Sequence, residues 1–291
     1  MLIPIIAAFA TAAGVIMDKI VLSYQKVGHR QFLVIVFFFL FVLCAILYPF
    51  LGKIDPRAFS SEYLFLLLLI IFIASIYNIL FYHGVEKEKI IEVELIIMLT
   101  PLSTILIASI FLQAERNLTV LLSGIIASLA LAISHLRHYH LSFNIFQRGL
   151  LLYLILFPLE AVLIKNLLSL YSPLALYLIR TFGVFVVLSF WYLFIAPYFK
   201  GEPKLTFSNW KAKNYNWCLA IAALAVLQMV LTYYAYVDFG VIFTTIVLTL
   251  APILVYLGST IILKEKLKKR IILAAAIILA CIAYANLALA R

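Results

Sequence analysis

The sequence predicts an all-α integral membrane protein with ten transmembrane helices. Of its 291 residues, 67% are hydrophobic and only 12% are charged, whereas soluble domains carry about 25% charged residues. The apolar residues form runs of about 20, and a helix of that length covers the hydrocarbon core of a bilayer. These runs lack the polar–apolar alternation of barrel strands. Backbone groups in lipid must then bond within each segment, which requires helices.

Ten runs have this length. We expect helices over residues 2–24, 31–51, 63–82, 90–112, 118–136, 149–170, 174–199, 217–236, 241–263 and 271–289. The longest loops between them, over residues 52–62, 137–148 and 200–216, are too short for a catalytic domain. The chain is therefore expected to be almost entirely membrane-embedded.

Two stretches of the chain share one plan, in which a helix with an interior proline is followed by a glutamate at a turn and by a second helix. Pro101 precedes Glu115 by fourteen residues, and Pro252 precedes Glu265 by thirteen. Both prolines are expected to kink their helices and to open room beside them. Both glutamates lie at turns, where a structural role is expected.

The duplication extends further upstream. Lys19 lies late in the first span as Lys165 does in the sixth, each followed four residues later by a serine, and Gly14 aligns with Glu160. Five spans per copy is an odd number, so the second copy is inverted relative to the first. We place the two repeats at residues 1–141 and 142–291, an arrangement that in transporters puts the binding site near the membrane midplane.

These motifs resemble the EamA-type branch of the drug/metabolite transporter superfamily. The third helix of each repeat carries tyrosine, in FYHGV at 81–85 and in TYYAYVDFGV at 232–241, and the proline and glutamate follow. The sequence departs from the family at Ala13, where an aromatic residue is usual, and at Val34, the counterpart of Arg180. The resemblance implies transport by alternating access, with cargo among amino acids, sugars, nucleotide sugars, cations and drugs.

An ionisable side chain at membrane depth is costly and is a candidate for function. Glu160 lies near the middle of the sixth span, two residues after Pro158, which should loosen the helix. It could carry a proton or bind a cation, or it could form a structural pair with Arg180 or Lys165. The guanidinium of Arg180 could bind a substrate carboxylate or phosphate, or could snorkel to the interface.

Other charged residues lie closer to helix ends. Lys19 and Lys165 could snorkel, but their recurrence in both copies keeps them as candidates. Asp18 points about 100° away from Lys19 around the helix, so the two are not expected to pair. Glu94 is deeper in the fourth span than Glu92 and could face a cavity, although the positive end of the helix dipole offers both a structural role.

Uncharged polar residues on the third, eighth and ninth spans could orient a polar solute, since by the resemblance these spans face the central cavity. The alternative for each is an interhelical hydrogen bond, worth only about 0.6 kcal/mol on average. The candidates are Tyr77, Asn78, Tyr82, Gln228, Tyr233, Thr245 and Thr249.

Composition and motifs also exclude classes of function. No G-x(4)-G-K-[ST] motif for ATP occurs, and the three aspartates are widely separated without an H-E-x-x-H motif, which argues against an intramembrane enzyme. The isolated cysteines lack C-x-x-C spacing. His135, His138 and His140 could bind metal, but neither carboxylate nor cysteine accompanies them, which favours a solvated basic turn. No cofactor or metal is expected.

The net charge of +10 arises from Lys and Arg in short loops, which is typical of membrane orientation and not of nucleic-acid binding. Most of these residues follow odd-numbered spans. The positive-inside rule then puts both termini outside the cytoplasm, whereas the resemblance implies cytoplasmic termini.

The sequence thus predicts a secondary active transporter for a small polar or amphipathic metabolite, which could be amino-acid-like, sugar-like or drug-like. Proton coupling through Glu160 is one option. A lipid or drug flippase of the same fold is the alternative. We expect a multi-pass monomer in a prokaryotic plasma membrane, in contact with membrane lipids and its small-molecule substrate.

Overall fold

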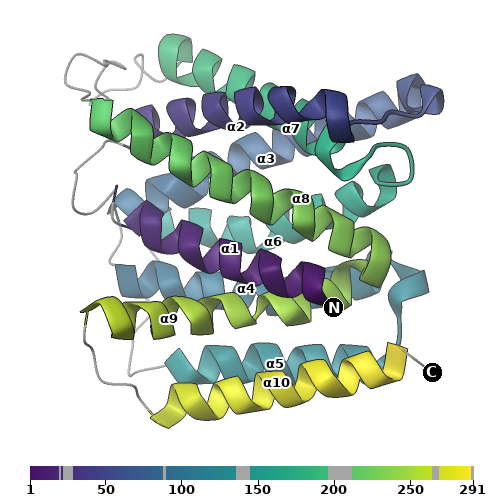
Figure 1. Cartoon of the computed structure of the whole chain (residues 1–291), viewed down its shortest axis with the longest axis vertical. Coiled ribbons are helices and arrows are strands. Elements are labelled where there is room, and N and C mark those ends of the chain that lie inside the picture. Colours follow the sequence, from purple (N-terminus) through teal and green to yellow (C-terminus); the bar gives the residue numbers. More distant parts are fainter. Residues whose placement is uncertain are drawn as a thin grey trace.

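A computed structural model shows an all-helical chain (Figure 1). It describes residues 1–19, 21, 29–87, 90–135, 145–195, 212–263 and 269–289, with side chains at all of these except 19, 29, 83–87, 90–97, 135, 145–148, 150 and 259–263.

Each of the ten expected spans contains a helix. The first half holds α1 (Leu2–Lys19), α2 (His29–Leu51), α3 (Ser61–Lys87), α4 (Ile90–Phe111) and α5 (Leu118–His135). The second half holds α6 (Ile145–Leu167), α7 (Pro173–Phe190), α8 (Ala212–Leu248), α9 (Leu250–Leu263) and α10 (Lys269–Leu289). Short helices η2 (Pro56–Phe59), η3 (Gln113–Glu115) and η4 (Trp191–Ile195) join or extend them.

Within the described residues, five segments are long and apolar enough to cross a membrane by length and composition. They are Arg30–Leu51, Ser61–Tyr82, Pro173–Ile195, Ala212–Gly258 and Lys269–Leu289. Shorter apolar helices occupy Leu2–Asp18, Met98–Phe111 and Leu118–Ser134. The chain is therefore an integral membrane protein built from apolar helices.

Helix α8 contains two helices joined at Gly240. The backbone there has φ 81° and ψ 168°, a conformation that glycine adopts without the penalty paid by other residues. This bend lies at the predicted boundary between the eighth and ninth spans. A second break, at Thr249 between α8 and α9, lies three residues before Pro252. Pro101 and Pro158 lie inside uninterrupted helices. The kinks predicted at these two prolines therefore stay predictions.

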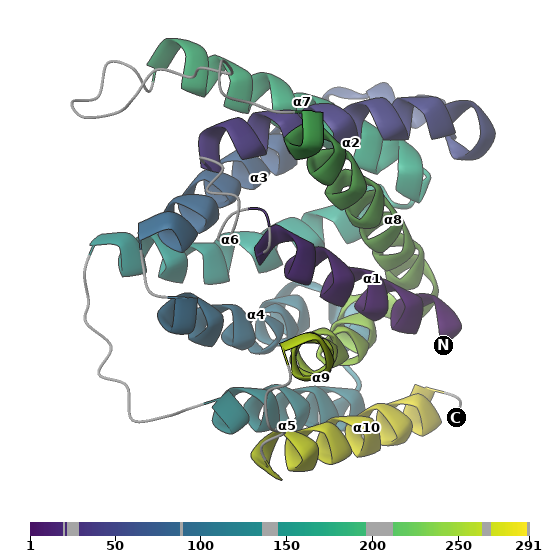
Figure 2. The ribbon, with the colours of Figure 1, turned by 60° about the vertical axis from the view of Figure 1, so that its left-hand side comes forward.

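The helix packing relates the two halves. Helix α1 packs on α8 as α6 packs on α3, and α9 packs on α1 as α4 packs on α6. Helices α2 and α7 pack on each other, as do α5 and α10 (Figures 1 and 2). Exchanging every helix for its counterpart leaves these pairs unchanged, as expected of two five-helix repeats. The boundary predicted at 141/142 lies outside the described residues.

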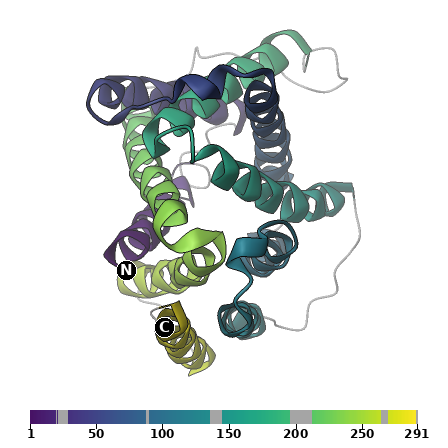
Figure 3. The ribbon, with the colours of Figure 1, turned by 90° about the vertical axis from the view of Figure 1, so that its right-hand side faces the viewer.

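At one end of the molecule a strap joins the two halves, formed by residues 51–58 of the α2–α3 loop and 168–173 of the α6–α7 loop. Ile54 and Tyr171 form an antiparallel bridge. Around it, the amide of Asp55 donates to the Leu170 carbonyl at 2.8 Å, and that of Ser172 donates to the Lys53 carbonyl at 2.9 Å. Figure 3 shows this end of the helices toward the viewer.

Candidate functional site

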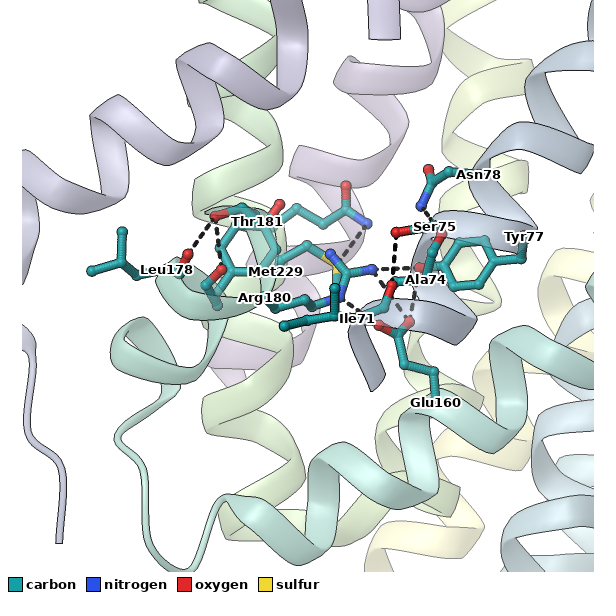
Figure 4. Close-up of polar contacts among 12 residues, drawn as sticks. Ile71, Ala74, Ser75, Tyr77, Asn78, Glu160, Leu178, Arg180, Thr181 and Met229 are labelled. Atoms are coloured by element: carbon teal, nitrogen blue, oxygen red, sulfur yellow. Dashed lines mark hydrogen bonds and ion pairs between the residues drawn. The ribbon is translucent and has the colours of Figure 1, made fainter. Parts of the chain in front are cut away.

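A buried polar cluster joins Glu160 of α6, Arg180 of α7 and Tyr77 of α3. The Arg180 Nε donates to Glu160 Oε1 at 2.5 Å, and its Nη2 donates to Glu160 Oε2 at 3.3 Å. The Tyr77 hydroxyl donates to Glu160 Oε2 at 2.8 Å and accepts from Arg180 Nη2. Figure 4 shows the three side chains converging from their separate helices.

The charges of Glu160 and Arg180 are buried and paired with each other. Glu160 is 2% exposed, Arg180 4% and Tyr77 6%. Both carboxylate oxygens of Glu160 accept hydrogen bonds, so the cost of burying its charge is offset by the guanidinium and the phenol. Glu160 therefore contacts Arg180, one of the two partners that the sequence offered it.

Aromatic rings surround the Tyr77 side of the cluster. Tyr153 and Phe157 of α6 each meet the Tyr77 ring edge to face, with centroids 5.6 Å apart. They precede Glu160 by seven and three residues, so they share its face of the helix. Sequence reasoning missed both, although this helical spacing from a buried carboxylate could have found them.

A second group of rings lies on the Arg180 side. The guanidinium carbon of Arg180 lies 5.8 Å from the centroid of the Tyr177 ring, one turn earlier on α7. Tyr177 in turn meets Tyr233 of α8 edge to face at 5.8 Å. Tyr233 is fully buried, and its hydroxyl has no hydrogen-bond partner. A polar atom therefore remains available beside the cluster.

Lys165, another predicted site residue, does not join the cluster. Its Nζ donates to the Tyr236 carbonyl of α8 at 2.5 Å. That carbonyl is near the end of the helix before the Gly240 bend, where a cation is favourable. Lys165 thus links α6 to α8.

The remaining polar candidates bond locally or pack against rings. Asn78 donates to the Ala74 carbonyl, Gln228 to the Met229 sulfur at 3.9 Å, Thr245 to the Val241 carbonyl and Thr249 to the Ile246 carbonyl, while Tyr82 packs on Phe32 and Phe81. The structure does not bring these side chains onto the Glu160–Arg180 pair. The side chains of Lys19 and Glu94 lie outside the described residues.

Glu115, for which the sequence predicted a structural role, reaches from the first half to the bend in the second. Its Oε2 accepts from the backbone amide of Ile242 at 3.0 Å, one of the orphan donors that start the helix after Gly240. Its Oε1 is buried without a partner. The glutamate of the first repeat therefore caps a helix of the second.

A cavity of about 430 Å³ lies at the strap, apart from the cluster. Its lining includes Lys53, Asp55, Tyr234 and the segment from Leu168 to Pro173. No set of three His, Cys, Asp or Glu side chains gathers where it could hold a metal ion in the part of the chain that the structure describes.

The sequence model of the EamA-like transporter family matches residues 1–136 and again residues 149–287. The chain belongs to the EamA-like transporter family. Glu160 and Arg180 lie in the second match and Tyr77 lies in the first. The family is one of membrane transporters of the drug/metabolite type, as the motifs indicated.

The solved structures agree on the fold. One crystal structure, described only as that of a protein, aligns with 98% of this EamA-like chain and 96% of its own, with a TM-score of 0.76 and 13% identity. At that identity the likeness shows the shared fold alone. A search of curated proteins finds no match.

Proposed function

We propose that this EamA-like protein is a secondary active transporter that moves a small polar or amphipathic metabolite by alternating access. The observation that carries the proposal is the buried pair of Glu160 and Arg180, held with Tyr77 at a junction of helices from both repeats. A single chain supplies every member of this junction, so we propose a monomer. We place it in a prokaryotic plasma membrane.

The pair also narrows the substrate. Separating Glu160 from Arg180 would leave two buried charges, and breaking a buried ion pair typically costs about 3–5 kcal/mol. A zwitterion offsets that cost, because its carboxylate can bind Arg180 while its ammonium binds Glu160. The surrounding rings suit an apolar side group, and the Tyr233 hydroxyl supplies a further donor. An amino-acid-like metabolite fits best, ahead of sugars and neutral drugs.

The strap supports alternating access. It joins the two halves by two backbone hydrogen bonds around Ile54 and Tyr171, so this end must separate if the repeats rock apart. The hydrogen bonds are made by the residues that flank Ile54 and Tyr171, so these two residues form a non-hydrogen-bonded pair. The Cα atoms of such a pair are about 4.5 Å apart, within the range of a disulfide. We expect oxidation of a double cysteine variant at these positions to arrest transport reversibly.

Screening by thermal shift with amino acids, sugars and organic cations would identify a ligand of the purified protein. Counterflow of that radiolabelled compound into proteoliposomes then tests transport. We expect wild type to show counterflow, Arg180→Lys to lose most of it because a lysine cannot make the bidentate contact, and the oxidised strap variant to lose it until reduced. Binding without counterflow would contradict the proposal, and transport of lipid analogues alone would favour a flippase.

A further inference from the structure

Asp18 is a carboxylate at the end of the apolar helix α1, and no group in the described part of the structure neutralises it. It lies on α1 one turn after Gly14, the counterpart of Glu160 in the first repeat. Its Oδ1 is buried and has no hydrogen-bond partner. The residue as a whole is partly exposed, so the buried oxygen belongs to a residue that still reaches accessible space.

The groups that face Asp18 leave its charge uncompensated. Helices α8 and α9 pack against α1. Among the described residues, Tyr82 of α3 and Cys218 of α8 lie close enough to interact electrostatically with Asp18, and both types of side chain are neutral at pH 7 in ordinary conditions. From α9, Gly258 approaches the apolar side chain of Ile16.

The neighbouring cation, Lys19, is not expected to pair with Asp18. Lys19 follows Asp18 on the same helix, and successive residues diverge by about 100° around the axis; its side chain is outside the described residues. Asp18 therefore differs from Glu160, whose two oxygens both accept hydrogen bonds from a cation or a phenol.

A buried carboxylate without a partner is stabilised by binding a proton or another small cation, since an isolated charge is costly in a medium of low dielectric. We propose that Asp18 is the proton-binding site that couples this transporter to a proton gradient, and that Glu160 holds Arg180 for the substrate instead. The coupling role rests on the proposed transport function. Proton binding by Asp18 itself does not.

Proton transfer to and from Asp18 requires only water as the other reactant. A hydronium ion from the side of the membrane to which Asp18 is open gives its proton to the Asp18 carboxylate, leaving water and a neutral carboxylic acid. Opening toward the other side hydrates the group and lets the proton leave to water there. The neutral form is the one that can remain buried while both ends are closed.

Infrared difference spectroscopy on the protein in lipid nanodiscs tests the proton site without any substrate. As pH is lowered, we expect a carbonyl band of a protonated carboxylic acid, shifted in D₂O, that is absent from Asp18→Asn and retained in Glu160→Gln and in the exposed-loop control Asp55→Asn. Asp18→Glu should keep a titrating band. A band lost only in Glu160→Gln, or unchanged in Asp18→Asn, would overturn the proposal.

Two further measurements separate the remaining outcomes. Repeating the titration with sodium in place of choline shows whether a metal cation displaces the proton, which would reassign the site. With the compound found by screening, Asp18→Asn should retain counterflow but lose accumulation driven by a pH gradient. Retained accumulation in that variant refutes the coupling role. Absent counterflow in wild type refutes the transport proposal and leaves the infrared result standing.

Discussion

Helices α1 and α6 open the two repeats, yet they carry their charges differently. At the aligned position, α6 has Glu160, tied to Arg180 and Tyr77, and α1 has Gly14, where an added Cβ would meet no atom within 4 Å. One turn later α1 has Asp18, whose buried oxygen lacks a partner. The aligned position therefore holds a charge-paired side chain in the second repeat and open space in the first, where an unpartnered carboxylate lies one turn away.

The two repeats therefore share their helix packing but not the charged residues of their first helices. The packing of α1 on α8 repeats that of α6 on α3, because helix packing depends on apolar surface that both copies supply. The charges depend on single positions. An asymmetric pair of first helices lets one repeat hold the substrate contacts while the other holds a group that exchanges protons.

The largest effect on stability should come from removing the cation that pairs with Glu160, which leaves this carboxylate without a charged partner, as Asp18 is. Replacing Arg180 by methionine leaves the Glu160 carboxylate buried without its cation, and we expect a loss of roughly 3–5 kcal/mol in the free energy of unfolding. Adding Glu160→Gln to this variant removes the stranded charge and should recover a large part of the loss. Unfolding by denaturant in mixed micelles measures both, and a double variant no more stable than the single one would refute this account of the pair.

A smaller effect is expected at Gly240, which lies beside the Glu115 carboxylate; one oxygen of that carboxylate has a hydrogen-bond partner and the other has none. A Cβ at Gly240 would lie 2.7 Å from the Glu115 carboxyl carbon, and the backbone there has φ 81°. Gly240→Ala should therefore cost about 1–3 kcal/mol in unfolding free energy. The matched control is Gly14→Ala, where the helix has open space and should gain up to about 1 kcal/mol. Equal effects of the two substitutions would show that the bend needs no glycine.

Hydropathy and repeat spacing were enough to predict the ten helices, because each span must satisfy its own backbone in lipid. The pairing of Glu160 with Arg180 was one of two stated alternatives, since two opposite charges at similar depth stabilise each other. The contact of Glu115 with Ile242 spans 127 residues, and no local pattern encodes such a contact. The helical angle between Asp18 and Lys19 predicts that these two do not pair, but it carries no information on the helices that pack against α1.

The smallest effect should come from the Asp55–Arg57 pair, which lies in a loop and not in the buried cluster. In the strap, both side-chain oxygens of Asp55 accept from Arg57 at 2.9–3.0 Å, which lowers the pKa of Asp55 to about 2. Because this folded-state pKa lies below the ordinary value near 3.8, the stabilisation is present above about pH 4 and is lost as pH falls toward 2. Solvent screens an exposed pair, so Asp55→Asn should lower the melting temperature only slightly at pH 7. The two melting curves should then converge between about pH 4 and pH 2; a gap that persists at the lower pH would mean that Asp55 acts through its loop hydrogen bonds and not through its charge.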